Sequence, residues 1–153
     1  MWKQMLFGGF KESRPGDGEW LVSLPEDQSE PILIILNIIH GHFSLVPTKP
    51  SLAELYGILE VTNKYDMSQV TRPWAASWME SIKEIYLEDG ASLPELLFVA
   101  WELGDAELFE ALTRRVVEGC RKDEGENLVG EDGRSLAEVL THPPHLYGKE
   151  RLG

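Results

Sequence analysis

The residues from Pro31 to Gly41 form the most apolar stretch of the chain, and they constrain its fold more than any other feature. On a helix, the apolar side chains of this stretch would point in nearly every direction, so other elements would have to cover most of its sides. Pro31 suits the first helical turn, and Gly41 suits the position just after the last one. The stretch is too short to span a bilayer. We therefore predict a buried core helix, with a buried strand as the alternative, because periodicity alone does not separate the two.

The composition limits the classes of partner. The chain has 153 residues, of which 42% are hydrophobic and 26% charged, as is usual for a soluble globular protein. Its net charge of −12 argues against nucleic-acid binding, which needs a basic surface, and against binding to an anionic membrane. The single cysteine, Cys120, excludes an internal disulfide and favours a cytoplasmic or nuclear protein.

Capping patterns predict where the other helices begin. The sequence Ser-Leu-X-Glu occurs at Ser51, Ser92 and Ser135, and in each case the serine and the glutamate can satisfy free backbone amides of a helix. A helical repeat would also explain the spacing, but the residues after each site do not match, which favours recurrent capping. Gly104 is predicted to end one helix and Asp105 to cap the next.

Only two segments have the composition of a strand, Glu19–Leu24 and His42–Pro47. A lone strand would leave unpaired backbone groups, so each needs a partner. The expected fold is therefore α+β and mostly α-helical, with one or two short strands.

Several segments, in this order along the chain, resemble the BTB/POZ domain, and in particular a branch found in filamentous fungi. The segments that carry the resemblance are Met5–Ser13, Leu24–Asp27, Ile34–Gly41, Leu52–Asp66 and Arg72–Ala75, followed by the Trp-Glu-Leu-Gly-Asp run of 101–105. The resemblance covers about residues 1–120.

The resemblance implies a partial BTB/POZ fold with a helical extension. Residues 1–83 would form a BTB-like domain that lacks the N-terminal hairpin and first helix of the family, as in a truncated protein. Residues 84–122 would form the extension, and 123–153 a linker, a short helix and a disordered tail. The missing elements would normally cover part of the 31–41 helix. We therefore expect Ile32–Ile39 to be less buried than its composition demands, with a partner chain able to cover the rest.

The resemblance also implies a function in protein–protein interaction. The family's members self-associate, and many are substrate adaptors that dock a cullin scaffold of a ubiquitin ligase. Phe10 and Glu12 match the hydrophobic-X-Glu turn with which the family contacts the cullin. In the competing interpretation, Phe10 packs onto Trp20 or the 31–41 helix, and Glu12 is solvated. A structural or degenerate remnant without adaptor activity is the alternative function.

The sequence gives little support to an enzyme or a metal site. His40 and His42 are two residues apart, and His142 and His145 three apart, but a zinc site needs about four nitrogen or sulfur ligands. Cys120 is the only thiol, and as a nucleophile it would need a positioned base. We expect it to be a buried apolar cysteine at a helix end. We predict no catalytic residue, no metal and no cofactor.

Overall fold

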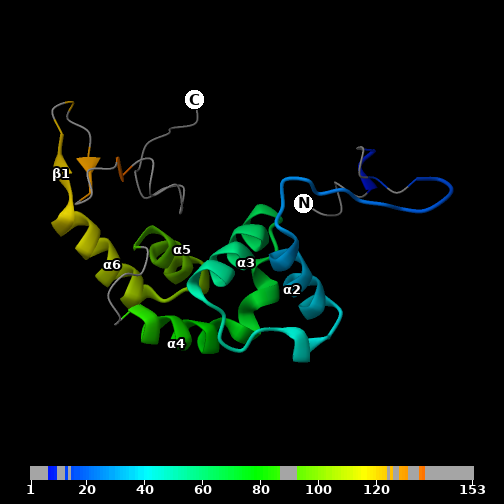
Figure 1. Cartoon of the computed structure of the whole chain (residues 1–153), viewed down its shortest axis with the longest axis horizontal. Helices are drawn as coiled ribbons and strands as arrows, with labels where there is room; N and C mark the ends of the chain where they lie inside the picture. Colours follow the sequence, from blue (N-terminus) through cyan, green and yellow to red (C-terminus); the bar gives the residue numbers. More distant parts are fainter. Residues whose placement is uncertain are drawn as a thin grey trace. The chain divides into compact units, whose positions relative to one another are not determined.

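The fold of the whole chain is given by a computed structural model (Figure 1). The structure describes residues 7–9, 13, 15–86, 93–123, 125, 128–130, 135 and 136. This part of the chain is mostly helical, as predicted. Its α-helices are α2 (Ser29–Ile39), α3 (Leu52–Lys64), α4 (Ala75–Tyr86), α5 (Leu93–Leu103) and α6 (Ala106–Gly119). Its 3-10 helices are η1 (Phe43–Leu45) and η2 (Ser68–Trp74), and its strands are β1 (Arg121–Lys122) and β2 (Leu128–Val129).

The chain divides into two compact units. The first comprises residues 1–47 and 57–73, and the second comprises residues 48–56 and 74–153. Helix α3 therefore contributes its first residues to the second unit and, from Gly57 on, the rest to the first. The boundary predicted after residue 83 falls within α4. The division into a BTB-like domain and an extension stays a prediction.

Helix α2 in the first unit lies where the apolar stretch predicted a helix. Pro31 is in its first turn, where a missing backbone N–H costs nothing. Gly41 has a φ of 76°, in the left-handed region that favours glycine. The N–H groups of Gly41 and His42 bond to the carbonyls of Ile38 and Asn37, at 3.1 and 2.8 Å. The helix thus ends in the way that the glycine predicted.

Both strand predictions are wrong. Residues 19–24 run as irregular chain, and the segment His42–Pro47 contains the 3-10 helix η1 (Figure 1). The observed ladder is elsewhere and spans the predicted boundary after residue 122: Arg121 and Lys122 pair antiparallel with Val129 and Leu128. A strand forms only where a second strand meets its backbone groups, and composition does not reveal that pairing.

The capping box that opens α3 has the predicted geometry. The Ser51 N–H donates to Glu54 Oε2 at 2.9 Å, and the Glu54 N–H donates to Ser51 Oγ at 3.3 Å. Each side chain thus satisfies one free amide of the first turn. Ser92, of the second predicted box, lies outside the described residues. Ser135, of the third, forms an isolated bridge with Val129, and most of the helix predicted after it also lies outside them.

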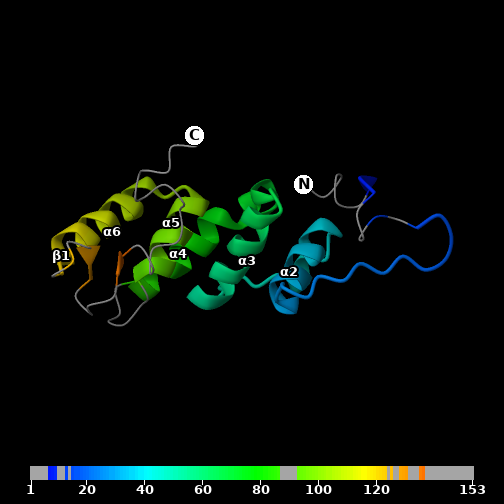
Figure 2. The ribbon, with the colours of Figure 1, turned by 90° about the horizontal axis from the view of Figure 1, so that it is seen from above.

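The second unit packs α4, α5 and α6 in sequence order, with α4 against α5 and α5 against α6 (Figure 2). Gly104, with a φ of 77°, ends α5, and Asp105 caps α6 by accepting a hydrogen bond from the Leu108 N–H at 2.9 Å. Both were predicted. Trp78 and Ile82 of α4 are fully buried. The remaining large core side chains of α5 and α6 are Leu96, Leu97, Phe98, Val99, Leu108 and Leu112.

Candidate interaction surface

The predicted cullin-contact residues, Phe10 and Glu12, lie outside the residues that the structure describes. In their neighbourhood it describes Phe7, whose ring lies 6.0 Å from that of Trp20 in an edge-on arrangement. The cullin-type contact and the alternative packing of Phe10 therefore both stay predictions.

Helix α2 has one buried face and one exposed apolar face. Pro31, Ile35 and Ile38 are buried. Leu33 is 58% exposed, Leu36 42% and Ile39 51%. With about 100° of rotation per residue, Leu33 and Leu36 lie on the side of the helix away from the buried residues, and Ile39 lies between that side and the buried face. The prediction that this helix is covered on most sides is therefore wrong, whereas the expectation of incomplete burial between Ile32 and Ile39 is confirmed.

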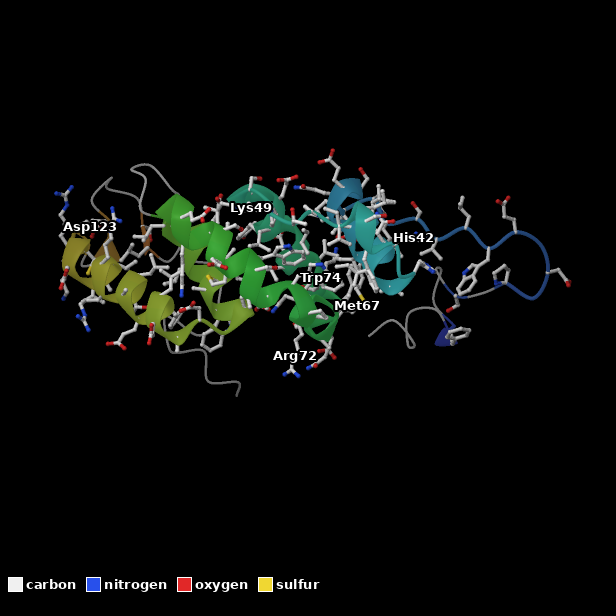
Figure 3. All side chains as sticks on the ribbon, turned by 90° about the horizontal axis from the view of Figure 1, so that it is seen from below. His42, Lys49, Met67, Arg72, Trp74 and Asp123 are labelled. Carbon is white, nitrogen blue, oxygen red and sulfur yellow. The ribbon has the colours of Figure 1, made fainter. Side chains whose placement is uncertain are left out.

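The exposed apolar residues continue from α2 into η1, which contacts it. Phe43 is 59% and Leu45 64% exposed. We call Leu33, Leu36, Ile39, Phe43 and Leu45 the α2–η1 surface. Figure 3 labels His42, which lies between the two helices.

No Asp, Glu, Lys or Arg occurs between Glu30 and Lys49, so the α2–η1 surface lies in a segment without fixed charge. Scattered exposed apolar residues are normal on a protein, but five in one short uncharged segment are unusual. Depletion of charge and exposed large apolar side chains are the features of an interface core.

Pro31, on the buried face of α2, lies close to Gly57 of α3. A Cβ added at Gly57 would lie 3.0 Å from Pro31 Cγ, closer than ordinary contacts between side chains. Gly57 is therefore the residue that lets the two helices approach at this point. Ile35, one turn after Pro31 on the same face of α2, is 2% exposed, whereas the residues of the α2–η1 surface are exposed.

Asp27 holds the turn before α2 to the C-terminal end of α3. Its Oδ1 accepts a hydrogen bond from Lys64 Nζ at 2.7 Å, and its Oδ2 accepts one from the Tyr65 hydroxyl. The side chain of Asp27 is only 5% exposed. Burial raises the pKa of its carboxyl, but the hydrogen bonds from Lys64 and Tyr65 and the charge of Lys64 together leave that pKa below its ordinary value. The same burial and the bond to Asp27 raise the pKa of Tyr65 to about 12.

The candidate metal and thiol residues do not form a site in the described part of the chain. The rings of His40 and His42 lie 6.3 Å apart, and no group of three or more His, Cys, Asp or Glu side chains among the described residues is placed to hold a metal ion. His142 and His145 lie outside the described residues. Cys120 follows α6 and donates to the Val117 carbonyl at 3.1 Å. It is half-buried rather than buried as predicted.

No helix in the described ranges has both the length and the apolar character needed to cross a membrane. Comparison of the chain with protein-family models, with curated proteins and with solved structures finds no match. The assignment of a function therefore depends on the chain's own surfaces.

Two features of the sequence correspond to the α2–η1 surface. An apolar run on all sides of a short helix predicts burial, but it does not say whether the same chain or another chain supplies the cover. The absence of charge through Thr48 was the feature that extended the surface beyond the helix.

Proposed function

We propose that this chain is a protein-interaction module of the BTB/POZ type that self-associates through the α2–η1 surface. The observation that supports it is the exposure of three large apolar side chains of α2, those of Leu33, Leu36 and Ile39. Fully burying a leucine or isoleucine side chain stabilises by about 1.5–3 kcal/mol relative to exposing it, so a partner that covers these residues gains substantial free energy.

The charge distribution of the chain favours a second copy of the chain as the partner that covers the α2–η1 surface. Each copy has a net charge of −12, so two copies repel one another over most approaches. The segment between Glu30 and Lys49 offers a surface on which two copies meet without placing carboxylates opposite one another. A symmetric contact of this surface with itself is the simplest closed arrangement, and closed dimers are the commonest oligomers.

Sedimentation velocity over a range of concentrations tests this proposal. The wild type should form a dimer, and Leu36→Glu should be a monomer because it places two carboxylates opposite each other in the contact. Val117→Glu, which replaces an exposed apolar residue of α6 with the same charge, is the matched control and should leave the dimer intact. Circular dichroism checks that each variant is folded.

The dependence of dimerisation on salt concentration is a second test of the proposal. Because repulsion between two acidic chains weakens as the Debye length falls from its value of about 8 Å at physiological ionic strength, added NaCl should strengthen the dimer. A wild type that stays monomeric at every concentration and ionic strength would contradict the proposal.

A role as substrate adaptor for a cullin-based ubiquitin ligase is a narrower proposal, and its support is the resemblance at Phe10 and Glu12. Binding of the purified chain to a cullin N-terminal domain, measured by pull-down, tests it. Phe10→Ala and Glu12→Lys should each abolish the binding, whereas Leu21→Ala, at another exposed apolar position, should not. If the wild type dimerises but binds no cullin, the interaction module stands without adaptor activity. If it does neither, the remnant alternative is favoured.

A further inference from the structure

A small cleft lies beside the contact of α2 with α3, within the first unit. Its volume is about 160 Å³. Sites for drug-sized ligands are larger, about 300–1,000 Å³, so this cleft has room for a single side chain rather than for such a ligand. Its apolar lining comes from Pro31, Gly57 and Val61. Gly57 contributes no side chain, which helps to keep the cleft open.

The polar lining of the cleft has an excess of negative charge. Glu26, Asp27, Glu60 and Lys64 all line it. Asp27 is already satisfied, because it accepts hydrogen bonds from Lys64 and from the Tyr65 hydroxyl. Lys64 is therefore neutralised within the protein and does not neutralise the other acids.

Glu26 and Glu60 are the carboxylates that remain. Both are exposed, and neither has a hydrogen-bond or ion-pair partner among the residues that the structure describes. They come from different elements, Glu26 from the turn before α2 and Glu60 from α3. The cleft thus combines an apolar wall with two unpaired negative charges.

We propose that this cleft receives the cationic side chain, lysine or arginine, of a partner protein. Lysine and arginine have an apolar stem and a charged head, and they bury the stem along apolar surface while the head stays near solvent. The stem would pack on Pro31 and Val61, and the head group would pair with Glu26 and Glu60. A bare metal ion fits the cleft less well, because much of the wall is hydrocarbon and hard cations need several oxygen ligands.

The cleft lies on a different face of α2 from the α2–η1 surface, so binding in it does not depend on self-association. It adds charge selectivity to the interaction module, since a partner would need a basic residue at the N-terminal end of α2. An acidic chain gains specificity from such a contact, because partners that place an acid there are rejected.

NMR titration of the ¹⁵N-labelled full chain tests the proposal. The probes are the capped tripeptides Ala-Arg-Ala and Ala-Lys-Ala, with Ala-norleucine-Ala as the neutral probe of similar shape. The two cationic peptides should shift the Gly57 and Val61 amide signals saturably, and the neutral peptide should not. Glu60→Gln and Glu26→Gln should each weaken the Kd by about threefold, as expected for an exposed ion pair. Glu80→Gln, at an exposed acid of α4, should leave the Kd unchanged.

Three results would overturn the proposal: no saturable shift with either cationic peptide, equal binding of the neutral peptide, or an unchanged Kd in the variant with both glutamates replaced. Agmatine has the arginine head group without the peptide, so it tests whether the cleft binds the side chain of a protein or a free amine. If agmatine binds more tightly than Ala-Arg-Ala, the cleft is a small-amine site and the proposal fails. The titration repeated in Leu36→Glu should give the same Kd, which separates this test from that of self-association.

Discussion

The Tyr65 hydroxyl donates a hydrogen bond to Oδ2 of Asp27, so that two residues 38 positions apart tie the end of α3 to the turn before α2. The other oxygen of the same carboxylate accepts from Lys64 Nζ at 2.7 Å. One side chain thus joins the turn before α2 to the C-terminal end of α3.

Replacing Asp27 should destabilise the protein more than replacing another acid. Asp27→Ala removes the partner of the Tyr65 hydroxyl, and Tyr65 is buried. A buried polar group left without its partner costs about 1–3 kcal/mol, so we expect a loss in this range in the free energy of unfolding measured with urea. Asp17→Ala, at an exposed acid, should change that free energy by less than about 0.5 kcal/mol. Equal losses in the two variants would contradict this role of Asp27.

The lowered pKa of the Asp27 carboxyl predicts that the protein loses stability in acid. Burial raises the pKa of Asp27, but the bonds from Lys64 and Tyr65 outweigh it, so the folded-state pKa lies below the ordinary value. A lowered pKa stabilises the folded state above the unfolded-state pKa of about 3.9, and this contribution is lost as the pH falls through the folded-state pKa. Urea unfolding below pH 4 should therefore show a steeper decline for the wild type than for Asp27→Asn.

The raised pKa of Tyr65 predicts that the protein also loses stability in alkali. Its pKa is raised to about 12, first by burial and then by the bond to Asp27, whereas an unfolded tyrosine titrates near pH 10. The contribution is fully present below about pH 10 and is lost as the pH rises through about 12. Absorbance of tyrosinate near 295 nm should show one residue titrating late, and Tyr65→Phe should remove that late step. A late step that persists in Tyr65→Phe would assign the raised pKa to another tyrosine.

Gly57 should resist replacement by alanine although it lies inside a helix. Alanine is favoured over glycine in a helix interior by about 1 kcal/mol, but a Cβ here would lie 3.0 Å from Pro31 Cγ. Gly57→Ala should therefore fail to stabilise the protein in thermal unfolding. In a Pro31→Ala background the Cγ is absent, and Gly57→Ala should then stabilise by up to about 1 kcal/mol. Equal effects of Gly57→Ala in both backgrounds would show that the contact with Pro31 is not what selects glycine.

Asp105 should stabilise α6 through its cap more than through its charge. Its side chain, which is 15% exposed, accepts from the Leu108 N–H at 2.9 Å and pairs at 2.5 Å with Lys83, whose side chain is 48% exposed. Asp105→Ala should cost about 1 kcal/mol of unfolding free energy, whereas Asp105→Asn, which keeps an oxygen for the cap, should cost markedly less. Equal losses in the two variants would show that the ion pair with Lys83 dominates.

The ends of several helices could be predicted from the sequence. Pro31 and Gly41 bounded α2, the Ser51–Glu54 box opened α3, and the Gly104–Asp105 pair separated α5 from α6. These signals are reliable because the free amides and carbonyls of a helix end are satisfied by side chains and backbone groups within four residues. The two strands could not be predicted in the same way, and the β1–β2 pair was missed, because a short ladder depends on its partner rather than on its own composition.

The sequence by itself thus determined a mostly helical chain, the ends of several of its helices, and an uncharged apolar segment from Pro31 to Thr48. The tertiary structure decided which side of that segment is covered. It did so through Gly57, which admits Pro31, and through Asp27, which meets Lys64 and Tyr65. Those contacts join residues far apart in the chain, and burial follows from such contacts rather than from local pattern. For this reason the α2–η1 surface and the cleft beside Glu60 are properties of the tertiary structure and not of the local sequence.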